Sequence, residues 1–172
     1  MKTLVVYYSR TGNTADLARR IAVGLDAQID EIIDRTNRQG ILGYLRSGRD
    51  AWLERRTELV PAKIDPSAFD LVVIGTPIWN FSLSSPVRTF LADHRNTMRS
   101  VAFFCTMGGR GDERVFRQMQ EACGKVPVAT FARSQSQLAS AELPAAIAAF
   151  VARLRGSAID AVDAAPQPAI LR

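Results

Sequence analysis

Six consecutive residues near the start of the chain combine three hydroxyl groups with a glycine and an amide. They are Ser9, Arg10, Thr11, Gly12, Asn13 and Thr14. They follow the apolar run 4–8 and precede a helix pattern, which places them in a turn between a strand and a helix. A glycine allows such a turn to tighten, and the unpaired N–H groups that begin a helix attract anions. The motif predicts a cradle for a small phosphate dianion, with an ordinary turn capped by Asn13 or Thr11 as the alternative.

Two other phosphate-binding motifs are missing from this turn. No lysine follows Gly12, as the loop of nucleotide triphosphate hydrolases requires. The glycine spacing of dinucleotide-binding folds is also missing. The sequence therefore argues against triphosphate hydrolysis.

Length and composition predict one globular domain. The chain has 172 residues, of which 47% are hydrophobic and 23% are charged, and this fits a single buried core. We expect the domain to occupy residues 1–156 and a flexible tail, rich in Ala, Asp, Pro and Gln, to occupy 157–172. The longest apolar runs are the length of strands, which predicts no membrane span. The first residues lack a signal-peptide layout, so we expect a cytoplasmic protein with Cys105 and Cys123 as reduced thiols.

Strand and helix signals alternate five times along the chain. The expected strands are 3–8, 29–33, 69–76, 101–106 and 126–132. The expected helices follow residue 14, span about 41–56, and begin near Ser84 or Ser85, Asp112 and Leu143. Alternation without a repeat predicts an α/β fold with a single doubly wound, five-stranded parallel sheet in the order 2-1-3-4-5 and helices on both faces. His94 falls late in the third helix, where we expect a helix-end residue and no metal site.

In this strand order, the loops after strands one, three and four meet at one crevice beyond the carboxyl ends of the strands. The loop after strand three contains Thr76, Pro77, Ile78, Trp79, Asn80 and Phe81. The loop after strand four contains Thr106, Met107, Gly108 and Gly109. Glycines let the backbone lie close to a flat ligand, and a large indole in a loop has little reason to pack in the core. The crevice thus combines a phosphate cradle, an aromatic wall and a glycine-rich wall.

This combination, over residues 2–155, resembles the flavodoxin family of FMN-binding proteins. The resemblance implies that Ser9, Thr11, Asn13 and Thr14 donate hydrogen bonds to the FMN phosphate and that Gly12 permits its approach. It also implies that Trp79 stacks on the isoalloxazine ring. Backbone groups of 77–80 and 106–109 would then bind the polar edge of the ring, while Arg10 either contacts the phosphate or points to solvent.

Three features depart from the pattern of an electron-carrying flavodoxin. Such carriers are strongly acidic, whereas this chain has a net charge of +5 and a pI near 9.8. Arginines are concentrated in the segment 35–56, which either attracts anionic partners or forms a solvated helix face. Asn80 stands where a glycine often follows the stacking tryptophan, and no second ring-clamping aromatic is evident. One ring face is therefore expected to be open.

Three functions remain as alternatives. The first is an FMN-binding electron-transfer protein with a protein partner, which the basic charge predicts to be acidic. The second is an FMN-dependent reductase that uses NAD(P)H and a small quinone-like acceptor. The third is a doubly wound module without flavin, although Cys105 lacks the arginine spacing of a cysteine phosphatase and Tyr8, Ser9 and Arg10 replace the acidic residues of a signalling receiver. No nucleic-acid-binding motif is present.

Overall fold

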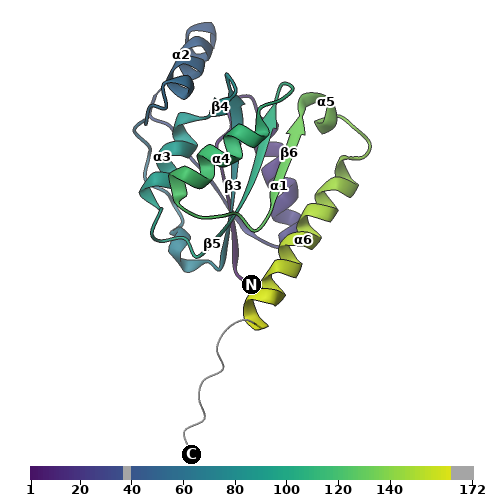
Figure 1. The fold of residues 1–172 in the computed structure, drawn as a ribbon. Coiled ribbons are helices and arrows are strands. Elements are labelled where there is room, and N and C mark those ends of the chain that lie inside the picture. The colour runs from purple at the N-terminus through teal and green to yellow at the C-terminus, as the bar shows by residue number, and fades with distance from the viewer. Residues whose placement is uncertain (37–39, 164–172) are drawn as a thin grey trace, which may run out of the picture.

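In the computed structural model, which describes residues 1–36 and 40–163, strands and helices alternate around one twisted sheet (Figure 1). The parallel strands are β1 (Thr3–Tyr7), β2 (Gln28–Glu31), β3 (Leu71–Trp79), β5 (Ser100–Met107) and β6 (Thr130–Ser134). Their order is β2-β1-β3-β5-β6. Because β5 and β6 are the fourth and fifth parallel strands along the chain, the predicted order 2-1-3-4-5 is confirmed. The short strand β4 (Ser82–Leu83) was not predicted, and it pairs antiparallel with the end of β3.

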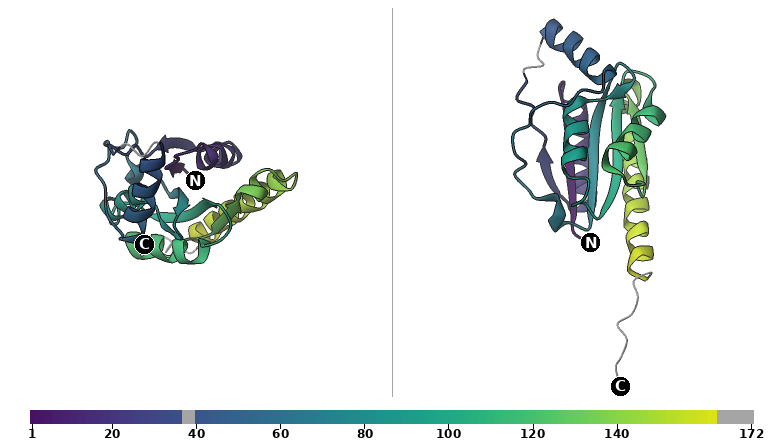
Figure 2. Two further views of the ribbon diagram at one scale, coloured as in Figure 1. Left: turned by 90° about the horizontal axis from the view of Figure 1, so that it is seen from above. Right: turned by 60° about the vertical axis from the view of Figure 1, so that its left-hand side comes forward.

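Helices cover both faces of the sheet, as predicted (Figure 2). The helices of one face are α1 (Asn13–Leu25) and α6 (Leu143–Asp163), and those of the other are α3 (Ser85–Asp93) and α4 (Asp112–Cys123). Side chains alternate along β1, so that Val5 packs with the first pair and Leu4 with the second. A strand that is buried on both faces has a continuous run of apolar residues, which explains why β1 could be predicted from the sequence. Two short helices, η1 (Pro66–Ala68) and α5 (Gln135–Leu138), complete the connections.

Each strand differs slightly from its predicted bounds, and two strands, β3 and β6, differ by three residues or more at one end. The last strand was expected at 126–132, but β6 begins at Thr130. Pro127 has no N–H to donate to a neighbouring strand, and Val126 is 75% exposed, so contact with β5 begins only at Val128, whose N–H donates to the Val101 carbonyl at 2.9 Å. The third strand was expected to end at residue 76, but β3 continues to Trp79 because its end pairs with β4.

Helix α2 (Gly40–Trp52) is shorter than the predicted 41–56 and stands beyond the carboxyl ends of the strands (Figure 1). It ends in a Schellman turn, in which Arg55 N–H donates to the Asp50 carbonyl and Glu54 N–H donates to that of Ala51. Glu54 adopts the left-handed conformation usual for this position, with φ 54°. The side chains of Ile41 and Leu45, predicted to share an apolar side with Trp52, lie outside the described part of the chain.

An irregular segment, 57–64, covers the face of β1 and β2 that a sheet helix would otherwise cover. Asp30 holds this segment in place, because its carboxylate accepts hydrogen bonds from the N–H groups of Lys63 and Ile64 at 3.0 and 3.2 Å. Leu59 and Ile64 pack against the core on this side. This segment therefore covers β1 and β2, and α2 reaches the same core near its end, through the fully buried Ala51.

Helices α6 and α3 bear on the predicted domain boundary and on the predicted position of His94. Helix α6 runs to Asp163, beyond the domain boundary expected at 156, and residues 164–172 of the expected tail lie outside the described residues. His94 forms the C-cap of α3, as its position predicted. No helix in the described part of the chain is long and apolar enough to cross a membrane.

Candidate functional site

The turn after β1 leads directly into the start of α1. Gly12 is the N-cap residue and has φ 95°, a conformation that favours glycine. A Cβ placed on Gly12 would meet no atom within 4 Å, so the backbone here faces open space. The loop is braced by a hydrogen bond of 3.2 Å from Gly12 N–H to Ser9 Oγ. No side chain among the described residues caps α1, and its first N–H groups therefore remain available to an anion.

Charges near this turn are arranged so that they do not repel an anion. Asp16 lies in the first turn of α1, where an acidic side chain would oppose a bound phosphate. Its carboxylate is paired with Arg20 Nε at 2.9 Å, and half of each side chain is exposed, so solvent screens the remaining field. Thr11 and Asn13 are exposed beside Gly12, and Arg10 is partly buried. The predicted cradle residues therefore lie together in the turn around Gly12.

A buried hydrogen bond joins this turn to the end of β5. The hydroxyl oxygens of Thr14 and Thr106 lie 2.7 Å apart, and these residues are 2% and 5% exposed. A hydroxyl donates one hydrogen bond and accepts two, so the pair keeps one proton for a further acceptor. Thr14 and Thr106 were predicted in different loops of the same site, and the fold brings them into direct contact.

Trp79 does not lie where the sequence predicted. This tryptophan was expected to project from a loop, but it is the last residue of β3 and is 7% exposed. Its indole packs edge-on against Tyr8, with ring centroids 5.4 Å apart and an interplanar angle of 89°. Thr76 is fully buried, and its hydroxyl contacts Ser84 Oγ at 2.9 Å. Trp79 thus belongs to the packed core directly beneath the crevice.

The exposed aromatic ring at this position is that of Phe81. Asn80 and Phe81 form the two-residue turn between β3 and β4, with φ values of 47° and 58°. Positive φ at both central positions defines a type I′ turn, in which the second position usually holds glycine. Phe81 is 51% exposed in this strained conformation. The sequence prediction included Phe81 in the site but gave the ring contact to Trp79, because the pair Asn80-Phe81 lacks the glycine that marks a two-residue hairpin turn in a sequence.

The loop after β5 supplies the third wall. A Cβ on Gly108 or Gly109 would meet no atom within 4 Å, so this backbone is open on its outer side. Met107 is partly buried at the end of β5. Gly111, the N-cap of α4 with φ 116°, lies against the second loop, since a Cβ on it would be 3.4 Å from the Cα of Phe81. Direct contacts therefore connect all three predicted loops.

Acid–base and metal chemistry find little support at this crevice. Cys105 lies on β5 close to the loops but is fully buried, and burial raises the pKa of its thiol. The reactive thiolate is therefore disfavoured, which argues against a cysteine phosphatase. Among the described residues, no group of three or more His, Cys, Asp or Glu side chains is placed to hold a metal ion. The crevice instead offers backbone amides, hydroxyls and apolar surface.

Comparisons with known proteins agree with this geometry. The Flavodoxin family model matches residues 2–147. A flavoprotein from Lactobacillus acidophilus NCFM, crystallised in complex with FMN, has 26% identity and a TM-score of 0.66, covering 80% of this chain and 96% of its own. A protein from Bacteroides eggerthii provisionally classed as a flavoprotein has 22% identity, a TM-score of 0.72 and coverages of 88% and 96%. A WrbA-like flavodoxin from Agrobacterium tumefaciens has 16% identity, a TM-score of 0.58 and coverages of 92% and 98%. No curated protein sequence matches significantly.

Proposed function

Because this chain belongs to the flavodoxin family, we propose that it binds FMN at the carboxyl ends of its strands and transfers electrons to or from a protein partner. The Lactobacillus flavoprotein crystallised with FMN supports the choice of cofactor. The observation that carries the proposal is the contact of the three loops. Thr14 bonds to Thr106, Tyr8 packs on Trp79, and Gly111 lies on Phe81.

The phosphate of FMN fits the loop around Gly12. The backbone at Gly12 faces open space, and the start of α1 offers N–H groups without a side-chain cap at the positive end of the helix dipole. The hydroxyls of Thr11 and Thr14 would donate to phosphate oxygens, and the Thr14–Thr106 pair has a proton left for this purpose. Ser9 holds the loop in shape through Gly12 N–H.

The ring of FMN fits between the second and third loops. The exposed ring of Phe81 offers an aromatic surface, and Trp79 supports the hairpin from below through its contact with Tyr8. The open backbone of Gly108 and Gly109 offers N–H and carbonyl groups to the polar edge of the ring. FMN, when bound, supplies the redox chemistry, and the protein binds and orients it.

A flavin-dependent reductase is the second candidate. The open space beside Gly108 and Gly109 would admit a nicotinamide or a quinone to one face of the ring. Steady-state oxidation of NADH and NADPH by the FMN-loaded protein, with and without a quinone, separates the two functions. Rapid turnover supports the reductase, and slow turnover beside fast electron exchange with a protein partner supports the carrier.

The phosphate assignment is tested with the double variant Thr11→Ala/Thr14→Ala. Its affinity for FMN should fall by about 1.5–3 kcal/mol for each lost charge-assisted hydrogen bond, measured by quenching of flavin fluorescence. Riboflavin, which lacks the phosphate, should bind the variant and the unchanged protein equally well. The exposed Thr130→Ala on β6 is a matched control that should bind FMN normally.

Two results would contradict the proposal. An unchanged FMN affinity in the double variant would remove the phosphate from the loop around Gly12. A purified protein that takes up no flavin from a large excess of FMN would end the case for the cofactor.

A further inference from the structure

A surface beside the flavin crevice combines exposed aromatic rings with arginines that form no ion pair with any described residue. Trp52, the last residue of α2, is 54% exposed. The guanidinium of Arg114, on α4, lies over its indole at 5.3 Å from the ring centroid. Trp52 therefore belongs neither to the core nor to the crevice, although it is one of only two tryptophans in the chain.

Close backbone approaches on both sides of the hairpin make this surface continuous with the crevice. Gly48 of α2 approaches Asn80 at the tip of the hairpin, because a Cβ on Gly48 would be 3.8 Å from the Asn80 Cβ. On the other side of the hairpin, Gly111 touches Phe81, and Arg114 follows it in the first turn of α4. We call the area formed by Trp52, Phe81, Arg110 and Arg114 the Trp52–Phe81 surface.

The end of α2 is held firmly in this position. Glu54, just after the helix, accepts hydrogen bonds from Arg88 Nη1 of α3 at 3.3 Å and from Gln118 Nε2 of α4 at 3.0 Å. Gln118 Oε1 also accepts from Leu83 N–H in β4. Through Glu54, the backbone that carries Trp52 is thus tied to α3, α4 and β4, which surround the crevice. Little backbone entropy would therefore be lost when Trp52 binds a partner.

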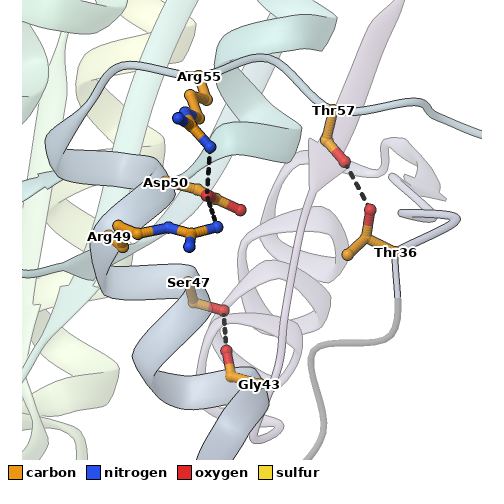
Figure 3. Close-up of polar contacts among 7 residues, drawn as sticks. All are labelled: Thr36, Gly43, Ser47, Arg49, Asp50, Arg55 and Thr57. Carbon is orange, nitrogen blue, oxygen red and sulfur yellow. Dashed lines mark hydrogen bonds and ion pairs between the residues drawn. The ribbon is translucent and has the colours of Figure 1, made fainter.

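Polar contacts within α2 and the segment after it add to this rigidity (Figure 3). Asp50 is buried and pairs with Arg49 at 3.2 Å and with Arg55 at 4.0 Å. Ser47 donates to the Gly43 carbonyl, and it is also buried. The last turns of α2 therefore form a fixed platform for Trp52.

The charge of the surface favours an acidic occupant. An arginine stacked on an aromatic ring keeps its in-plane N–H groups free to bind a carboxylate in a bidentate manner. Within the part of the chain that the structure describes, no ion pair involves Arg110 or Arg114. Asp112 and Glu113 also lie here, but both are in the first turn of α4, where the helix dipole offsets their charge.

We propose that the Trp52–Phe81 surface is the docking site for an acidic redox protein, whose carboxylates pair with Arg114 and Arg110 around an apolar contact to Trp52. This inference rests on the proposed electron-transfer function, because it places the partner beside the flavin. Exposed aromatic and arginine side chains are the types that carry most of the energy of protein interfaces. Complementary charge would mainly steer the approach and speed association.

The test measures binding of a strongly acidic [2Fe–2S] ferredoxin by calorimetry, with the protein both free of flavin and saturated with FMN. Arg114→Glu and Trp52→Ala should each weaken binding at low salt by about tenfold or more. The matched controls are Arg153→Glu, an exposed charge on α6, and Val23→Ala, an apolar side chain on α1 that is 83% exposed. Both controls should stay within about twofold of the unchanged protein.

The outcomes separate docking from flavin binding. Because the ferredoxin is also tested without flavin, a protein that fails to bind FMN can still show the expected order of variants, which would support the docking site alone. Equal binding by all four variants would overturn the proposal, as would no binding by the unchanged protein at low salt. Heparin provides a further comparison. Loss of ferredoxin and heparin binding in Arg114→Glu, with no loss of either in Trp52→Ala, would indicate general attraction of polyanions and would also overturn it.

Discussion

Valine in place of Thr14 or Thr106 removes one partner of the buried hydrogen bond that joins the first loop to β5. Valine has nearly the shape of threonine, so packing changes little. The remaining hydroxyl has almost no access to water, since the two residues are 2% and 5% exposed. A buried hydroxyl without a partner costs about 1–3 kcal/mol, and each single variant should lose that much unfolding free energy.

The double variant Thr14→Val/Thr106→Val should lose much less than the sum of the single variants. No hydroxyl is left unsatisfied in it, and replacing both partners with apolar groups of the same shape is nearly neutral. We therefore expect a coupling free energy of at least about 1 kcal/mol, measured by urea unfolding of the flavin-free protein at neutral pH.

This reasoning depends on the contact itself and not on the flavin. Additive losses, with a coupling below about 0.5 kcal/mol, are typical of independent sites and would refute it. An exposed pair gives the matched control, because Thr130→Val and Thr97→Val have no shared contact and should be additive.

Two further predictions concern stability. Gly75→Ala should lower the unfolding free energy by about 1–3 kcal/mol in urea titrations, because its Cβ would lie 2.0 Å from the ring of Phe104. Gly108→Ala, whose Cβ meets no atom within 4 Å, is its control, and equal stability of the two variants would contradict the packing. Burial lowers the pKa of His94 in the folded protein despite two nearby carboxylates, so the unfolded chain binds its proton first and stability should decline as the pH falls below about 6.5. His94→Gln should flatten this decline between pH 7 and 5, and an NMR titration of this single histidine giving a pKa above 6.5 would contradict the prediction.

The strand order and the three loops could be predicted from the sequence because each depends on local patterns. The buried run around Val5 can only be a strand covered on both faces, and Gly12 lies where a strand meets a helix. The boundaries of α2 and β6 were less accessible. The end of α2 depends on Glu54 in a left-handed conformation, which side-chain type does not predict, and the start of β6 depends on which partner strand accepts residues after Pro127.

The different positions of Trp79 and Phe81 could not be predicted from composition. Both are large aromatic residues in one short segment, and their roles are decided by where the chain reverses. The turn at Asn80 and Phe81 leaves Trp79 as the last residue of β3, above Tyr8, and turns Phe81 outward. A turn one residue earlier, at Trp79 and Asn80, would place Trp79 in the exposed reversal and Phe81 in the strand.

In many doubly wound folds, one helix both covers the sheet and carries a recognition surface. Here segment 57–64, held at Asp30, covers the sheet beside β1 and β2, and α2 carries the exposed Trp52. Because Lys63 and Ile64 are anchored to Asp30, this segment covers the core beside β1 and β2, to which α2 adds the buried Ala51. Substitution of the exposed Trp52 at the end of α2 should thus change what the molecule recognises while leaving its folding intact. Natural or laboratory selection could then alter partner choice in this helix without a loss of the scaffold.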